Sequence, residues 1–286
     1  IHEKLDVVIL GMHAFEDNPE LKKAQEMGLK IQSFPEFVFE QSKNKQRIVV
    51  AGSCGKTTIT GMVMHALKAA GRNFDYLVGA QIPGFDNPVK LSKDAPMIVV
   101  EGDEYLASRI DPRPKFLFYN PHVVAITGVS WDHINVFPSE LEYIDAFDSL
   151  IGTIPKAGTI IYNNADKTLE GLVKAYADEA HYVEEYKVPK YRVNEGKFEI
   201  SVNKKWLSMR MIGRHNMENM AAAAKICQQA GVGEEAFFQS MQDYQGAQFR
   251  QEIVHDDSTI RVYRDYAHAP EKVLNMLEKY HTWRRG

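Results

Sequence analysis

The stretch that decides the fold is Gly52-Ser53-Cys54-Gly55-Lys56-Thr57-Thr58, here called the phosphate loop. The apolar run 47–51 precedes it, and residues 59–67 follow it with the apolar spacing of a helix. This order predicts a strand, a glycine turn and a helix, in which backbone N–H groups and the helix N-terminus point at a phosphate. We expect Lys56 at the outer phosphates of a nucleotide and the Thr57 hydroxyl on Mg²⁺. The loop is shorter than the common pattern, and an ordinary strand-to-helix turn is the alternative.

Composition is that of an ordinary globular chain of two or three domains, with 286 residues, 44% of them hydrophobic and 25% charged. A net charge of −4 predicts no nucleic-acid partner, and the absence of a long apolar run predicts no membrane partner. The two cysteines, Cys54 and Cys227, favour a reducing cytoplasm. The start at Ile1 and the open end at Gly286 predict a piece of a longer protein. The oligomeric state cannot be read from these features.

Polar groups follow two apolar strands at the point where each strand ends. Residues 101–104, Glu-Gly-Asp-Glu, follow the strand 97–100, and Asp132 and His133 follow the strand 123–127. Ligands of open α/β sheets bind at the carboxyl ends of strands. Three clustered carboxylates repel one another without a cation, so a metal role is favoured over a solvated acidic turn. Asp132 could orient the imidazole of His133 as a ligand, or it could cap a helix beside a surface histidine.

The N-terminal part alternates strands and helices. Strands are predicted at 6–12 and 30–34, and helices at 18–28 and 35–42. This β-α-β-α order is typical of a parallel sheet. The polar residues 43–46 form the first predicted domain boundary.

The middle of the chain predicts further elements of the same kind. Residues 72–96 are expected to be irregular, a helix is expected at 139–151, and a strand at 158–164 leads into a helix at 166–178. Between 181 and 212 polar and apolar residues alternate, which predicts antiparallel strands beside the main sheet.

A helix rich in alanine is predicted over 217–230, and Asn216 and Asn219 lie near its start. They are three residues apart and share a helical face, and each side chain offers a donor and an acceptor that suit an adenine edge. Helix capping by Asn216 is the alternative. A helix at 234–243 follows, and residues 253–264 predict a hairpin that opens a third domain.

Four stretches resemble the ATP-dependent Mur ligases, and Asp132-His133 adds a fifth. The four are Gly52-x-x-Gly55-Lys56-Thr57-Thr58, Glu101-x-Asp103-Glu104, Gly213-x-His215-Asn216-x-x-Asn219-x-x-Ala222-Ala223 and Asp265-Tyr266-Ala267-His268-x-Pro270. The resemblance implies an α/β fold in which a central P-loop ATPase domain with a mainly parallel sheet is flanked by partial Rossmann-like domains. The implied ranges are a partial UDP-sugar-binding domain at 1–46, the ATP-binding domain at 47–252 and a truncated C-terminal domain at 253–286.

The resemblance also implies ATP and Mg²⁺ and assigns site residues. It assigns nucleotide contacts to the phosphate loop and to residues nearer the C-terminus: Gly52, Ser53, Cys54, Gly55, Lys56, Thr57, Thr58, His215, Asn216, Asn219, Arg250, Asp265 and His268. It assigns Mg²⁺ to Thr57, Glu101 and His133. It assigns catalytic roles to Lys56, Glu101, His133 and Arg250.

Some positions depart from the family pattern. Gly128 stands where an asparagine is frequent, Phe249 replaces the first arginine of a pair, and Ala269 replaces a second histidine. Residues 145–148 contain no lysine that could be carbamoylated, as in the branch that binds UDP-N-acetylmuramate itself.

Residues 101–105, 111–116 and 131–138 are most similar to the branch that acts in peptidoglycan recycling. That branch joins UDP-N-acetylmuramate to the murein tripeptide L-Ala-γ-D-Glu-meso-diaminopimelate through an acyl phosphate. The alternatives are the L-alanine-adding branch, a folylpolyglutamate synthase-like enzyme, and, in another class, an ATP-hydrolysing switch or binding module. The chain as given could also be an inactive piece of its parent.

Overall fold

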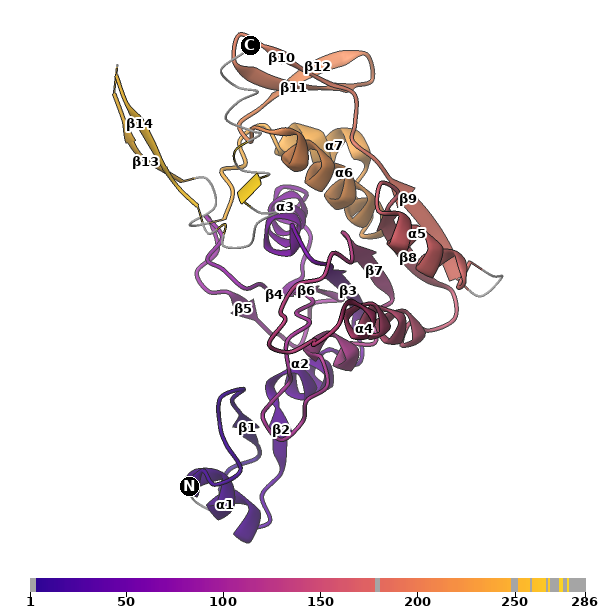
Figure 1. The fold of residues 1–286 in the computed structure, drawn as a ribbon. Coiled ribbons are helices and arrows are strands. Elements are labelled where there is room, and N and C mark those ends of the chain that lie inside the picture. The colour runs from indigo at the N-terminus through magenta and orange to yellow at the C-terminus, as the bar shows by residue number, and fades with distance from the viewer. Residues whose placement is uncertain are drawn as a thin grey trace.

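The computed structural model describes residues 4–177, 181–247, 252–257, 259–265, 267, 273–274 and 277. Its centre is a seven-stranded sheet in the order β5-β4-β6-β3-β7-β8-β9 (Figure 1). All neighbouring strands are parallel except β4 and β5. The strands are β3 (Gln46–Ala51), β4 (Asp75–Leu77), β5 (Val89–Lys90), β6 (Met97–Glu101), β7 (Val123–Ile126), β8 (Gly158–Asn163) and β9 (His181–Tyr186). The mainly parallel sheet predicted from the sequence is confirmed.

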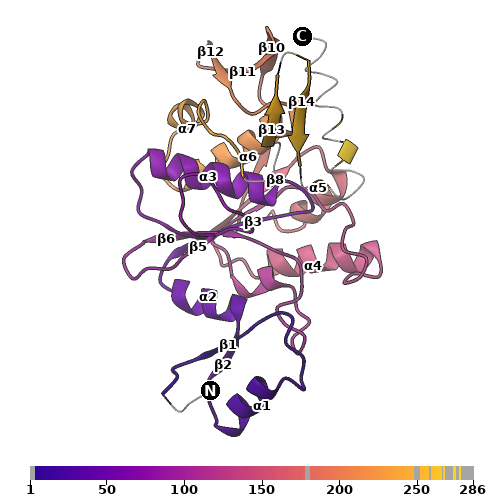
Figure 2. The ribbon, with the colours of Figure 1, turned by 90° about the vertical axis from the view of Figure 1, so that its left-hand side faces the viewer.

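Helices cover both faces of this sheet, which is why its middle strands bury apolar side chains on both faces. In β3, Ile48 and Val50 enter the core under one set of helices, and Val49 and Ala51 enter the core on the other face. Figure 2 shows the two layers on either side of the sheet. The first layer holds α3 (Lys56–Ala69), α6 (Arg214–Gln229) and α7 (Glu234–Ser240), and the second holds α2 (Phe34–Ser42), η1 (Lys115–Phe118) and α4 (Glu140–Gly152).

Helix starts follow the local signals in the sequence. Asn18 caps α1 (Pro19–Glu26), Ser33 forms a capping box with Glu36 in α2, and Ser139 and Asp166 cap α4 and α5 (Lys167–Lys174). The strands β1 (Val8–Leu10) and β2 (Ile31–Ser33) form a separate parallel pair below α2 (Figure 1). The helix α2 packs on the central sheet, because its Val38 is fully buried in the second core.

Two expectations for the sheets were wrong. Residues 181–186 do not form an antiparallel strand, because β9 pairs with β8 in parallel as the edge of the main sheet. Their alternating polarity reflects an edge strand that is only partly covered. Residues 72–96 are not wholly irregular, since they contain β4 and β5, and β4 is held by a buried ion pair between Asp75 and Lys45.

The remaining strands agree with the sequence. The strands β10 (Tyr191–Asn194), β11 (Lys197–Val202) and β12 (Lys205–Met209) form an antiparallel sheet beside the main one. The strands β13 (Glu252–Asp256) and β14 (Arg261–Arg264) form the predicted hairpin, which projects from the body in Figure 1. Over the described part of the chain, no helix has both the length and the apolar character needed to span a membrane.

Candidate active site

The phosphate loop joins β3 to α3, and two glycines give it its shape. Gly52 has a φ of 121° and Gly55 a φ of 85°. A Cβ on Gly52 would lie 2.2 Å from Thr127 Oγ1, and a Cβ on Gly55 would lie 2.6 Å from Asn219 Oδ1. Both positions therefore require glycine, because the loop is pressed between the end of β7 and the helix α6.

Lys56 lies at the first position of α3 and points back into the loop. Its Nζ donates to Gly52 O at 2.7 Å and lies 3.0 Å and 2.9 Å from the two carboxylate oxygens of Glu104. Burial by itself would lower the pKa of Lys56, but the carboxylates, Glu104 foremost, outweigh burial and raise it. Lys56 is thus held as a cation inside the loop.

Thr57 and Glu101, two predicted Mg²⁺ ligands, lie together. Thr57 Oγ1 donates to Glu101 Oε1 at 2.6 Å, and Glu101 Oε2 accepts from Gly79 N at 2.7 Å. The contact arises because β3 and β6 pair in parallel, with Val50 opposite Glu101, so that their carboxyl ends meet.

This pair of oxygens fits Mg²⁺, which prefers one or two carboxylates and completes its coordination with phosphate and water. Within the described residues, no group of three His, Cys, Asp or Glu side chains could enclose a metal by itself. The donor set therefore suits a cation that arrives with phosphates.

His133 follows β7 with a φ of 57°, which is unusual for a residue other than glycine. Its Nε2 lies 3.0 Å from Glu104 Oε1 and 4.0 Å from Asp132 Oδ2. Asp132 Oδ1 instead accepts the backbone N–H of His133 at 2.8 Å, and the ring meets Tyr105 edge-on at 4.8 Å between centroids. The carboxylate within hydrogen-bonding reach of the imidazole is therefore Glu104, and not Asp132.

The three carboxylates that the sequence grouped together have different partners. Asp103 pairs with Lys115 at 2.6 Å, while Glu101 accepts from Thr57 and Glu104 pairs with Lys56. Two lysines thus offset two of the three negative charges. The repulsion among the carboxylates is therefore weaker than the sequence suggested, and it is a weaker argument for a bound metal ion.

Glu104 belonged to the predicted carboxylate cluster, but the sequence analysis gave it no role of its own. Its side chain is 0% exposed, and Tyr143 of α4 covers it with its hydroxyl 3.5 Å from Oε1. Burial would raise the pKa of Glu104, but Lys56 and the hydrogen bond from His133 hold it below the ordinary range. Its place after β6 was visible in the sequence, whereas its burial depends on a helix about forty residues away.

The predicted adenine residues lie at the start of α6. Asn216 is 1% exposed, and its Nδ2 donates to Ile212 O at 2.7 Å, which holds the turn that enters the helix. Asn219 packs against Gly55, and His215 is the second residue of the helix. The structure thus brings Asn219 to the phosphate loop, and the adenine contacts of all three remain a prediction.

Three further residues were predicted to belong to the site. Arg250 and His268 are outside the described residues. Asp265 directly follows β14, and its Oδ1 accepts from Ala267 N at 2.8 Å.

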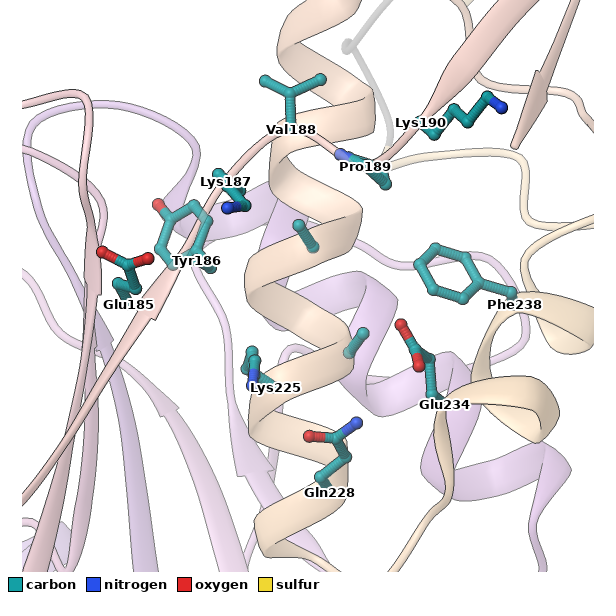
Figure 3. A pocket seen from close by; sticks show the side chains of 12 residues that line it. Glu185, Tyr186, Lys187, Val188, Pro189, Lys190, Lys225, Gln228, Glu234 and Phe238 are labelled. Carbon is teal, nitrogen blue, oxygen red and sulfur yellow. The ribbon is translucent and has the colours of Figure 1, made fainter. Parts of the chain in front are cut away.

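A cavity of about 500 Å³ lies between α6, α7 and the connection from β9 to β10 (Figure 3). Lys187 and Val188 come from the connection, Lys225 from α6, and Glu234 and Phe238 from α7. None of its lining residues belongs to the phosphate loop or to the ends of β6 and β7, so it is separate from the site around Lys56.

The family model described as "Mur ligase middle domain" matches residues 50–227, which include the phosphate loop, Glu101, His133 and Asn219. The chain belongs to the Mur ligase family.

Two curated relatives carry names of different reactions. One, from Haemophilus influenzae, is named UDP-N-acetylmuramate–L-alanyl-gamma-D-glutamyl-meso-2,6-diaminoheptandioate ligase and is 27% identical over 95% of this chain and 62% of its own length. The other, from Desulfitobacterium hafniense, is named UDP-N-acetylmuramate–L-alanine ligase and is 26% identical over 96% of this chain and 62% of its own length.

Solved structures of this family share the fold. The UDP-N-acetylmuramate:L-alanyl-gamma-D-glutamyl-meso-diaminopimelate ligase from Neisseria meningitides superposes with a TM-score of 0.74 at 23% identity, over 86% of this chain and 80% of that chain. The UDP-N-acetylmuramate-alanine ligase of Thermotoga maritima superposes with a TM-score of 0.73 at 21% identity, over 98% of this chain and 65% of that chain. The chain spans about three fifths of the length of the curated relatives, 62% in both cases.

Proposed function

We propose that this Mur ligase chain belongs to an ATP-dependent, ADP-forming ligase that joins UDP-N-acetylmuramate to the tripeptide L-Ala-γ-D-Glu-meso-diaminopimelate. The observation that carries the proposal is the cluster at the ends of β3, β6 and β7. There Lys56 and Thr57 of a glycine turn lie 3.0 Å and 2.6 Å from the carboxylates Glu104 and Glu101. A lysine, a hydroxyl and a carboxylate at a helix N-terminus are the groups that bind and polarise a nucleotide triphosphate.

The residues would divide the work as follows. Lys56 binds the β- and γ-phosphates, Thr57 and Glu101 hold one Mg²⁺, and His133 holds a second. When bound, Mg²⁺ offsets the negative charge of the phosphates, so that an anionic carboxylate can approach them. Arg250 would add a cation at the γ-phosphate.

The reaction proceeds in two steps. An oxygen of the muramoyl carboxylate attacks the γ-phosphorus, the bond from that phosphorus to the β–γ bridging oxygen breaks, and ADP leaves. The resulting acyl phosphate is attacked by the amine, phosphate leaves from the tetrahedral intermediate, the nitrogen loses a proton, and an amide remains. Lys56 stabilises the charge on the transferred phosphoryl group in the first step.

The remaining assignments are part of the same proposal. His215, Asn216 and Asn219 bind adenine, Asp265 and His268 approach the nucleotide or the acyl phosphate, and the domains are 1–46, 47–252 and 253–286. ATP and UDP-linked sugars are substrates of the cytoplasm, where we place the reaction.

A second candidate is the addition of L-alanine to the same UDP-sugar. It is favoured by the relatives named UDP-N-acetylmuramate–L-alanine ligase, which match this chain at 26–29% identity. Both candidates use the same phosphate site, so only the amine separates them.

The test is phosphate release by the full-length protein with ATP, Mg²⁺ and UDP-N-acetylmuramate. One arm adds the tripeptide, one adds L-alanine and one adds no amine. Stimulation by the tripeptide alone supports the proposal, and stimulation by L-alanine alone supports the second candidate. Phosphate release at the same rate with and without each amine refutes both candidates and favours an ATP-hydrolysing switch.

A further inference from the structure

Glu104 joins three parts of the phosphate site through one carboxylate. It follows β6, and its oxygens lie 2.9 Å from Lys56 Nζ, 3.0 Å from His133 Nε2 and 3.5 Å from Tyr143 OH. These partners come from α3, from the loop after β7 and from α4.

This carboxylate constrains two side chains that would otherwise have freedom. A lysine side chain has four rotatable bonds, and a fixed counter-ion at its tip removes much of that freedom. An imidazole ring can turn over, and a hydrogen bond at one nitrogen determines which nitrogen faces a ligand. Because Glu104 is itself fully buried, its carboxylate is held in place by packing.

We propose that Glu104 is a positioning residue, which sets the place of the Lys56 ammonium and the orientation of the His133 ring at the phosphate site. With Nε2 3.0 Å from Glu104 Oε1, Nε2 donates its proton to that carboxylate, and Nδ1 is the nitrogen left to face a ligand. The effect on catalysis rests on the proposed function, whereas the placement of the two side chains does not.

The placement is tested without turnover, by ¹⁵N NMR of the histidine rings in the full-length protein at about pH 8, above the ordinary pKa of histidine. The signals of His133 are identified by their loss in a His133→Ala variant. A proton on Nε2 that is hydrogen-bonded to a carboxylate supports the proposal. A ring protonated on Nδ1 alone overturns it.

The consequence for turnover is tested with Glu104→Gln, which keeps the shape and removes the charge. Replacing a residue that orients a ligand-binding histidine typically lowers activity about 10–100-fold. We therefore expect the kcat of phosphate release to fall about 10–100-fold. The KM for ATP should stay level or fall, because a negative charge is removed beside an anionic ligand. A variant that was merely less folded would not separate kcat from KM in this way.

Glu184→Gln is the matched control. Glu184 also receives a lysine and an amide, with Lys225 Nζ at 3.2 Å and Gln229 Nε2 at 2.8 Å, but it lies on β9 away from the phosphate loop. Equal kcat values for the two variants overturn the positioning role. If the wild-type protein shows no amine-dependent release, the proposed function fails, and the NMR result still decides the placement.

Discussion

Replacing Gly52 by alanine tests whether the phosphate loop has the geometry described above. The φ of 121° at this position is one that residues with a side chain rarely adopt. The added Cβ would lie 2.2 Å from Thr127 Oγ1 and 2.6 Å from Thr127 N. The Thr127 hydroxyl can rotate away only by breaking its hydrogen bond to Cys54 O, and the backbone nitrogen is held because it donates to Ala51 O at 3.0 Å. The alanine must therefore displace the loop or separate β3 from β7.

The expected cost has two parts. The backbone conformation costs about 1–3 kcal/mol, and the forced contact costs about 1–3 kcal/mol, as for other overpacked sites. Gly71→Ala gives a lower bound for the first part, since Gly71 has a φ of 66°, in the left-handed region, and no heavy atom within 4 Å of its added Cβ. We therefore expect the Gly52 variant to lose about 1–3 kcal/mol more unfolding free energy than the Gly71 variant.

The free energy of unfolding of both variants is measured by urea titration, alongside phosphate release. Gly52 O accepts from Lys56 Nζ at 2.7 Å, so a displaced loop also moves the lysine and lowers turnover. Gly71 lies at the far end of α3, and its variant should keep its turnover. If the two variants lose the same stability, within about 0.5 kcal/mol, the close approach of Gly52 to β7 is refuted.

Three further predictions use single side chains. Lys56→Ala should abolish phosphate release and lower the unfolding free energy by about 3–5 kcal/mol, since the buried carboxylate of Glu104 loses its cation; near-normal release would contradict the assignment. Cys54 is partly exposed, so iodoacetamide should modify it, and more slowly when MgADP is present. Cys227 is buried, and burial raises the pKa of its thiol, so it should stay unmodified until the protein unfolds. Mass spectrometry of the alkylated peptides checks both. Burial, and then the charge of Arg47, lower the pKa of His122. The unfolded state therefore takes up the proton more readily, and stability should fall as the pH drops below about 6.5. In urea titrations between about pH 7 and 5.5, the unfolding free energy of His122→Asn should change less with pH than that of the wild type. The same pH dependence in both proteins would contradict this reasoning.

The sequence predicted the features that depend on neighbouring residues. The glycine turn before α3 and the caps at Asn18 and Ser139 involve contacts within about four residues. Such contacts form wherever the local sequence allows them, so their spacing could be read from the chain. The meeting of Thr57 with Glu101 was also expected, because the parallel order of strands brings their ends to one edge.

Features that depend on distant contacts could not be read in this way. The strand β4 has only three residues and begins with an aspartate, and it is recognisable only once Lys45, thirty residues earlier, pairs with Asp75. The direction of β9 depends on its pairing with β8, since an edge strand alternates in polarity whichever way it runs. The sequence offered Asp132 as one carboxylate that could orient His133, but the fold brings Glu104 closer to the ring.

Glu101 and Glu104 are three positions apart and contact the neighbouring side chains Thr57 and Lys56, and Gly102, one of the two residues between them, explains how. Gly102 continues the pairing with β3, since its N–H donates to Val50 O at 2.8 Å. A Cβ there would lie 2.7 Å from Val49 Cγ1, so only glycine lets the chain stay this close to β3. Glu101 thereby remains in register with the strand and reaches Thr57, while the chain beyond Gly102 turns under α4 and buries Glu104 beside Lys56. One glycine thus lets a single short turn supply an oxygen ligand on one side of the phosphate loop and a buried counter-ion on the other.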